Sequence, residues 1–180
     1  MTRFAMVIDT KTCIGCGDCV VACKTENKVP DGLNRDWIVE ATRGVYPQLE
    51  TEFRSERCNH CSNPTCVTLC PTGASHLWND TNIVLVDADR CTGCKACIAA
   101  CPYDARLVMH PDGYVDKCTF CHHRVEQGLD PACVSTCPTN CMHFGSLDDP
   151  GSVVSELLRT RNYKVLSPET GNEPNVYYLV

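Results

Sequence analysis

The sequence predicts an α+β protein built from two small units, one nested within the other, with short hairpins and helices. Three observations lead to this prediction. Cysteine supplies 17 of the 180 residues, and sixteen of these cysteines fall into four similar groups of four. Without its cysteines, the apolar residues make up about a third of the chain, which is a thin hydrocarbon core for this length. Short strand-like runs bounded by turn residues separate the groups.

The four groups share closely spaced cysteines, and three of them end in a Cys-Pro pair. In chain order they are Cys13, Cys16, Cys19 and Cys23; Cys58, Cys61, Cys66 and Cys70 before Pro71; Cys91, Cys94, Cys97 and Cys101 before Pro102; and Cys118, Cys121, Cys133 and Cys137 before Pro138. Proline ends a helical turn because it has no amide hydrogen to donate. Group one has Lys24 in the place of this proline, so we expect its helix to continue through residues 24–27.

The spacing of group three is typical of proteins that hold pairs of iron–sulfur clusters. Its pattern, C-x2-C-x2-C-x3-C-P, supplies three ligands to one [4Fe-4S] cluster, while the fourth cysteine ligates the other cluster of the pair. Zinc usually takes two cysteine pairs separated by a long loop, and an odd number of cysteines disfavours a disulfide framework. The sequence therefore predicts four [4Fe-4S] clusters as cofactors. A zinc-stabilised interaction module is the less favoured alternative.

Exchange of the fourth cysteine requires the groups to pair. Groups two and three form the inner unit, residues 58–102, because the segment between them contains two strand-like runs around a polar turn, which indicates a hairpin. Groups one and four then form the outer unit, residues 1–57 plus 103–150. Residues 151–180 form a C-terminal helix and an extended tail. Sequential pairing of group one with two, and of three with four, stays open, although the long separation of groups one and two disfavours it.

The favoured pairing gives four sets of iron ligands. They are Cys13, Cys16, Cys19 and Cys137; Cys23, Cys118, Cys121 and Cys133; Cys58, Cys61, Cys66 and Cys101; and Cys70, Cys91, Cys94 and Cys97. One helix can serve two clusters, because Cys97 and Cys101 lie four residues apart and so share one helix face.

The segments outside the groups predict connecting structure. Residues 37–54 alternate around a Gly-Val-Tyr-Pro turn, and residues 106–117 contain a central Pro-Asp-Gly, so both predict hairpins. Residues 152–161 predict a short helix with Ser152 as its N-cap. The tail, residues 163–180, is extended and ends in an apolar strand that we expect to pack on its own domain.

Several single residues near the ligands have two interpretations. Cys141, the seventeenth cysteine, is expected to be a buried thiol that fills space, although it could face a cluster. His60 and the other histidines beside the ligands are expected to be partly exposed and to have structural hydrogen bonds. Lys95 and Lys117 could raise the potential of a nearby cluster or could be solvated surface lysines.

Composition and motifs argue against several classes of function. A net charge of −6 and a pI near 5.4 disfavour a nucleic-acid partner, which would require a basic face. No apolar run is long enough to span a bilayer, and the first residues lack the apolar region of a secretory signal. No nucleophile triad, open zinc site or phosphate-binding loop is present, so we expect a non-catalytic subunit with no catalytic residue of its own.

Four stretches of the sequence resemble one known family. MVIDTKTCIGCGDCVVACKTEN, CNHCSNPTCVTLCPTGA, CTGCKACIAACPYDAR and DKCTFCHHRVEQGLDPACVSTCPT are similar to the iron–sulfur electron-transfer subunits of the dimethyl sulfoxide reductase family of molybdopterin enzymes. The similarity extends over nearly the whole chain and is strongest to the polysulfide and thiosulfate reductase branch. It implies two ferredoxin-like units and supports the pairing of group one with group four.

The resemblance also implies partners and a location. It implies a catalytic subunit with molybdenum or tungsten and a quinone-linked membrane subunit, with the outer cluster pair nearer the former and the inner pair nearer the latter. It further implies a membrane-associated complex on the periplasmic face, reached by export with a signal-bearing partner, while a cytoplasmic complex stays open. The alternative function is electron transfer within a soluble formate dehydrogenase, hydrogenase or transhydroxylase complex.

Overall fold

A four-stranded sheet joins segments from both ends of the chain in the computed structural model, which describes residues 2–180. Its strand order is β8 (Met142–Ser146), β1 (Phe4–Asp9), β10 (Val176–Leu179) and β9 (Tyr163–Lys164). β1 runs parallel to β10, with Met6 opposite Val176, and antiparallel to β8, with Phe4 opposite Ser146. Because β1 is a central strand and both faces of the sheet are covered there, its residues Ala5 to Ile8 are fully buried.

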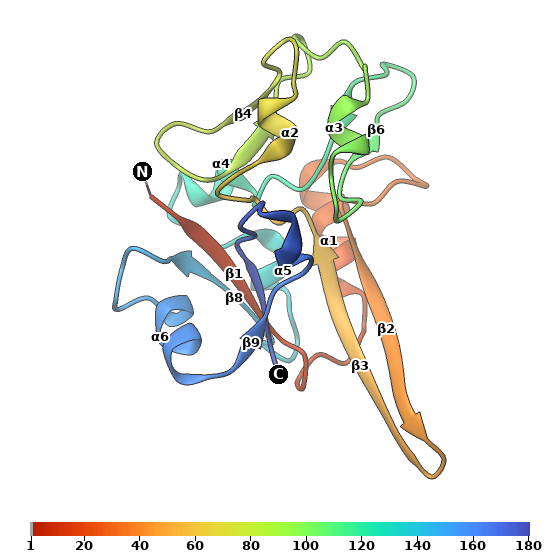
Figure 1. Ribbon diagram of the computed structural model, residues 1–180, viewed down its shortest axis with the longest axis vertical. Coiled ribbons are helices and arrows are strands. Elements are labelled where there is room, and N and C mark those ends of the chain that lie inside the picture. The colour runs from red at the N-terminus through yellow and green to blue at the C-terminus, as the bar shows by residue number, and fades with distance from the viewer. Residues whose placement is uncertain (1) are drawn as a thin grey trace.

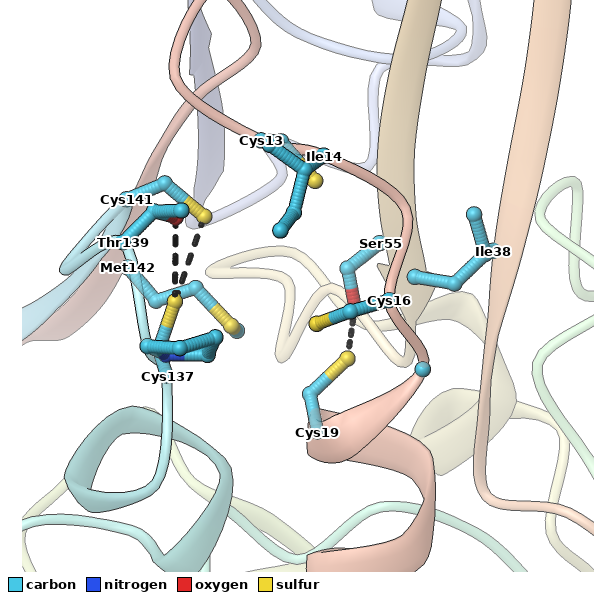
Figure 2. Close-up of a pocket in the computed structure, with 12 residues that line it drawn as sticks. Cys13, Ile14, Cys16, Cys19, Ile38, Ser55, Cys137, Thr139, Cys141 and Met142 are labelled. Carbon is cyan, nitrogen blue, oxygen red and sulfur yellow. Dashed lines mark hydrogen bonds between the residues drawn. The ribbon is translucent and has the colours of Figure 1, made fainter.

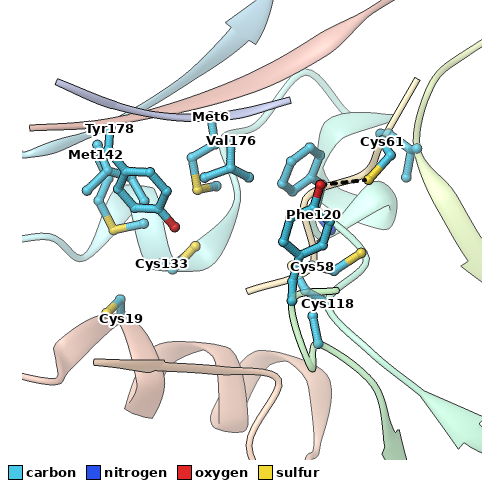
Figure 3. Packing of buried hydrophobic residues seen from close by; sticks show 14 of the residues in the cluster. Met6, Cys19, Cys58, Cys61, Cys118, Phe120, Cys133, Met142, Val176 and Tyr178 are labelled. Atoms are coloured by element: carbon cyan, nitrogen blue, oxygen red, sulfur yellow. Dashed lines mark hydrogen bonds between the residues drawn. The ribbon is translucent and has the colours of Figure 1, made fainter. Parts of the chain in front are cut away.

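The two faces of this sheet pack against different parts of the molecule. Val7 and Leu179 point to one face, where helix α6 (Val153–Thr160) covers them with Val154. Met6 and Ile8 alternate to the opposite face, as the two-residue period of a strand requires. There they join a core that contains many of the grouped cysteines, together with Val176 and Tyr178 (Figure 3). The sheet is therefore a wall between a small apolar layer and the cysteine-rich interior.

Short helices carry or adjoin cysteines of each group. Helix α1 (Asp18–Asn27) has ten residues, whereas α2 (Thr65–Thr68), α3 (Ala96–Ala99), α4 (His122–Val125) and α5 (Ala132–Ser135) have four each. The expected continuation of the first helix through residues 24–27 is confirmed, since no proline ends it. In α2, α3 and α5 the chain leaves the helix just before the Cys-Pro pair.

The three hairpins that the sequence predicts are present. The longest pairs β2 (Asp36–Val45) with β3 (Gln48–Arg57) and extends away from the rest of the molecule as an arm (Figure 1). It is slightly longer than the predicted 37–54. The other two pair β4 (Ser75–Leu77) with β5 (Val84–Val86), and β6 (Leu107–Val108) with β7 (Val115–Asp116).

The last thirty residues pack on the rest of the chain, as expected, partly in the sheet and partly against the loop of Cys58 and Cys61. The Ser152 side chain accepts a hydrogen bond of 3.2 Å from the amide of Ser155, so the predicted N-cap of α6 is confirmed. A 3-10 turn, η1 (Pro168–Thr170), precedes β10, which lies inside the sheet between β1 and β9. Within residues 2–180, none of the helices has the length and apolar character needed to cross a bilayer.

Candidate metal centres

The first cavity, which we call site one, gathers cysteines from both ends of the outer unit. Cys13, Cys16, Cys19 and Cys137 line a space of about 310 Å³ and come from the loop before α1, from α1 itself and from the end of α5 (Figure 2). The same space is lined by Cys141, whose sulfur lies 3.4 Å from that of Cys137. Cys141 is buried, as expected, and it also faces the cavity.

Two further cavities of nearly the same size lie in the inner unit. Site three, of about 340 Å³, is lined by Cys58, Cys61, Cys66 and Cys101. Site four, of about 330 Å³, is lined by Cys70, Cys91, Cys94 and Cys97. The three cavities have similar volumes, and each is lined by the four cysteines of one set of the favoured pairing.

The remaining four cysteines form site two, in the middle of the molecule. Its members, Cys23, Cys118, Cys121 and Cys133, are all buried. The side-chain amide of Asn27 lies 3.7 Å from the sulfurs of both Cys23 and Cys121. Burial raises the pKa of the Cys23 thiol, and the nearby Cys118 and Cys133 raise it further. The structure thus brings together each of the four predicted sets.

The four sites lie in the order one, two, three, four. Cys19 and Cys23 on α1 connect sites one and two, and Cys97 and Cys101 at α3 connect sites three and four. Cys118 of site two lies near Cys58 of site three. Burial has the largest effect on the pKa of Cys118 and raises it. The charge of Arg57 lowers this pKa, and the charge of Cys58 raises it.

These sites fit a cubane cluster better than a single ion. Within residues 2–180, no three Cys, His, Asp or Glu side chains converge closely enough to hold one ion. A cubane has an iron at each of four separate corners, so its ligands surround it rather than meet at a point. Backbone amides point at several sulfurs, as with Ser75 to Cys70 at 3.3 Å and Val115 to Cys91 at 3.4 Å. Such donors stabilise a thiolate ligand.

The loops of sites one and four repeat each other in backbone as well as in sequence. Gly15 and Gly93 have nearly identical left-handed φ angles of 68° and 66°. A Cβ at Gly93 would lie 2.6 Å from the carbonyl oxygen of Gly113, and one at Gly15 would lie 2.6 Å from the Phe53 ring. Glycine is favoured at both places, because the left-handed φ disfavours a side chain and a Cβ would clash with these neighbours.

Burial raises the pKa of several thiols in these sites. Burial raises the pKa of Cys118 to about 12 and that of Cys133 to about 11, against the opposing charge of Arg57. Burial likewise raises the pKa of Cys61 to about 12. Because a metal ligand must be a thiolate, cluster binding at these positions releases protons and is weakened by acid.

The structure corrects the expectation for His60 and decides between the two interpretations of Lys117. His60 is expected to be partly exposed, but it is fully buried, and its Nδ1 accepts a 3.0 Å hydrogen bond from the amide of Val84. Burial, followed by the charges of Lys117, Arg106 and Arg57, lowers the pKa of His60 well below its usual range. Lys117 is not a surface lysine, because only 1% of it is exposed. Packing between segments distant in the sequence buries both side chains.

Two buried arginines beside the sites have no counterpart among the residues that the sequence singles out. Arg57, at the end of β3, donates a 3.0 Å hydrogen bond to the sulfur of Cys133 and bonds to Ser55, whose hydroxyl lies 3.3 Å from the sulfur of Cys19. Arg106 lines both site three and site four. A row of basic residues in a motif would have been a signal, but each arginine is isolated in the sequence.

Comparisons with known proteins agree with this geometry. Residues 49–147 match a family model described as a 4Fe-4S dicluster domain, and residues 12–74 match a second model of the same description. A tetrathionate reductase subunit of Salmonella typhimurium is 43% identical over 189 residues, covering 98% of this chain and 72% of the relative. The chain belongs to the iron–sulfur subunits of the molybdopterin reductases.

Other relatives of this iron–sulfur subunit act in different reductases. The arsenate respiratory reductase iron-sulfur subunit ArrB of Shewanella sp. is 34% identical, covering 98% of this chain and 96% of the relative. A selenate reductase subunit of Mesobacillus selenatarsenatis is 36% identical, covering 98% of this chain and 72% of the relative. The predicted family and the fold of two ferredoxin-like units with 4Fe-4S clusters are confirmed.

Proposed function

We propose that this iron–sulfur subunit holds four [4Fe-4S] clusters in a line and conducts electrons between a molybdopterin catalytic subunit and a quinone-linked membrane subunit. The observation that supports the number four is the assembly of sixteen cysteines into four sets, three of them around cavities of about 310, 330 and 340 Å³. When bound, each cluster accepts and releases one electron at a time. The relatives named as subunits of reductases support the catalytic partner.

The residues of this chain hold and insulate the clusters. The ligand sets are those of sites one to four, and the outer unit (residues 1–57 plus 103–150) and the inner unit (residues 58–102) each contribute two. Shared segments fix the spacing between neighbours, since α1 carries Cys19 and Cys23, and α5 carries Cys133 shortly before Cys137. The buried thiols of site two keep water away from the middle of the line. The chain therefore supplies position and environment, while substrate chemistry belongs to the catalytic partner.

The partners follow from the family and from the two ends of the line. Sites one and four each have an exposed cysteine, Cys16 and Cys94, so an electron donor or acceptor can approach there. We assign site one to the catalytic subunit and site four to the membrane subunit, in a complex on the periplasmic face of the membrane. Co-purification from detergent-solubilised membranes tests this assembly, and recovery of the chain with a soluble dehydrogenase or hydrogenase would replace it.

The cluster count is tested by metal analysis of protein purified without air. We expect about sixteen iron and sixteen acid-labile sulfide per chain, with interacting cubane signals in the electron paramagnetic resonance (EPR) spectrum after reduction. About eight of each would reduce the proposal to two clusters. Stoichiometric zinc without labile sulfide would show a structural zinc module instead.

The pairing is tested at Cys137, which lies far from group one in sequence. Cys137→Ser is expected to perturb the EPR signal of site one, because its sulfur lines that cavity. Loss of a signal from the inner unit in this variant would overturn the pairing. Cys141→Ser is the matched control, because this neighbouring thiol is the fifth in the cavity and we assign it no iron.

A further inference from the structure

Three buried cations lie along the line of sites, one at each junction. Arg57, Lys117 and Arg106 are 1%, 1% and 6% exposed. Buried charges of this kind are costly unless an anion compensates them. Their positions show which anion that is.

Arg57 lies between sites one and two. Its guanidinium reaches the sulfur of Cys133 in site two directly and the sulfur of Cys19 in site one through Ser55. It also has a counter-charge, because an oxygen of the buried Asp36 lies 3.6 Å from it. The field of Arg57 at both sites is therefore partly cancelled.

Lys117 lies between sites two and three. It directly precedes Cys118 of site two, and its amine donates a 2.7 Å hydrogen bond to the carbonyl of that residue. The same amine bonds to the carbonyl of Val84, which lines site three. Among residues 2–180, no carboxylate forms an ion pair with Lys117, since both of these partners are neutral.

Arg106 lies between sites three and four, and its side chain lines both cavities. One nitrogen donates a 2.9 Å hydrogen bond to the Ser75 hydroxyl, while Nη1 is buried and has no protein acceptor within residues 2–180. No carboxylate in that part of the chain pairs with Arg106 either. A buried donor without an acceptor costs free energy, so a negatively charged group in the adjoining cavities would satisfy both the charge and the hydrogen bond.

We propose that Arg57, Lys117 and Arg106 are junction cations, each of which stabilises an added electron on the two clusters it separates. A cubane held by four thiolates is an anion and gains a further negative charge on reduction, so a buried cation favours the reduced state and raises the potential. Each cation also reduces the repulsion between neighbouring reduced clusters. The proposal rests on the four-cluster function proposed above.

The test is a redox titration followed by EPR on the anaerobically purified protein. Arg106→Gln is expected to lower the reduction potentials of the clusters in sites three and four, by about 59 mV for a tenfold change in the one-electron equilibrium. The reduction potential of the cluster in site one should not change. Arg106→Lys keeps the charge and should restore most of the shift. Lys95→Gln is the matched control, because Lys95 also lines site four but is exposed, so its field is screened by solvent.

Asp36→Asn gives an independent test with the opposite sign. Removing this carboxylate leaves the charge of Arg57 uncancelled, so the potentials of the clusters in sites one and two should rise while those of sites three and four stay. If the potentials of sites one and two fall or do not change in Asp36→Asn with full iron content, the proposal is overturned. Equal shifts of potential in Arg106→Gln and Lys95→Gln would also overturn it. Absence of iron and sulfide from the unmodified protein would instead overturn the four-cluster function itself.

Discussion

The end sites and the middle sites of this chain differ in their contact with solvent. Sites one and four each present an exposed cysteine, Cys16 and Cys94, which occupy the same place in their motifs. All four cysteines of site two are buried, and site three has none that is exposed. The spacing of the ligands differs as well, because the end sites use three cysteines at two-residue gaps, whereas the middle sites have a longer gap, from Cys121 to Cys133 and from Cys61 to Cys66. Under the proposed function, the end sites are the ones that exchange electrons with partners, and the middle sites exchange electrons with their neighbours.

The largest effect is expected from removing one ligand at each kind of site. Cys133→Ser should cost about half of the bound iron or more, because its loss also deprives the buried Arg57 of its sulfur partner. Cys94→Ser should cost about a quarter of the bound iron, which is the share of one cluster in four. The loss stays at this one site because solvent tolerates a change at an exposed ligand. Iron per chain after anaerobic purification measures both. Equal losses would break the distinction between middle and end.

A smaller effect is expected from the loop of site four. Gly93→Ala puts a methyl group 2.6 Å from the Gly113 carbonyl oxygen, whereas Gly113→Ala meets nothing within 4 Å. Both residues have positive φ, so each substitution costs about 1 kcal/mol from backbone strain, and Gly93→Ala should cost at least about 1 kcal/mol more. Apparent unfolding temperatures at one heating rate compare the two. Equal unfolding temperatures for the two variants would show that the loop of site four moves to accommodate the added methyl group at little cost.

A kinetic difference of about threefold or more should separate the sites in air, because oxidation of thiolate ligands follows their exposure. The clusters of sites one and four, with Cys16 and Cys94 at the surface, are expected to lose their EPR signals before those of sites two and three. Samples taken at intervals after aeration, reduced again and measured, follow each signal. Loss of a middle signal first would contradict the insulation of the middle sites.

The smallest effect is expected at a surface link beside site two. Glu26 on α1 accepts hydrogen bonds from His123 at 2.8 Å and Arg124 at 3.2 Å on α4. The hydrogen bond from His123 is the largest cause that lowers the pKa of Glu26. The contribution of ionised Glu26 to the free energy of unfolding is therefore present above its ordinary pKa of 4.5, and it is lost as the pH falls through the lowered pKa.

Glu26→Gln should lower stability at pH 7 by only a few tenths of a kcal/mol, about the value of an exposed ion pair. Thermal unfolding at low and high salt measures the change, and salt should erase most of it. A loss of iron in this variant would mean that the packing of α1 on α4 controls site two more than burial does.

Local patterns in the sequence predict the four cysteine groups and most of the elements, because each of these signals lies within a few residues, whereas the pairing of the groups is not a local signal and stays a prediction. The Cys-Pro pairs mark the helix ends, Ser152 marks the start of α6, and turn residues mark the hairpins. The buried cations could not be predicted in this way. Arg57 reaches Cys133 across 76 residues, and Lys117 reaches Val84 across 33. Such contacts depend on packing between segments, for which spacing gives no rule.

The tail shows the same limit. Its apolar residues predict the last strand, but the parallel pairing of that strand with β1 joins positions about 170 residues apart. Nothing local in Val176 to Leu179 specifies that partner. The burial of β1 on both edges explains the pairing once the fold is known, because an unpaired central edge would leave its amides and carbonyls without partners.

The nested order of the ligand sets has a consequence for the order in which they become complete during protein synthesis. A chain emerging from the ribosome has all eight thiols of sites three and four once Cys101 is free, while Cys13 still waits for Cys137 and β1 waits for β10. On the proposed pairing, the ligand sets of the inner unit are therefore complete before those of the outer unit. Iron and sulfide would then be delivered to an incompletely synthesised chain. On the proposed function, a chain interrupted between Cys101 and Cys137 would hold the inner clusters but would not conduct electrons to the catalytic partner.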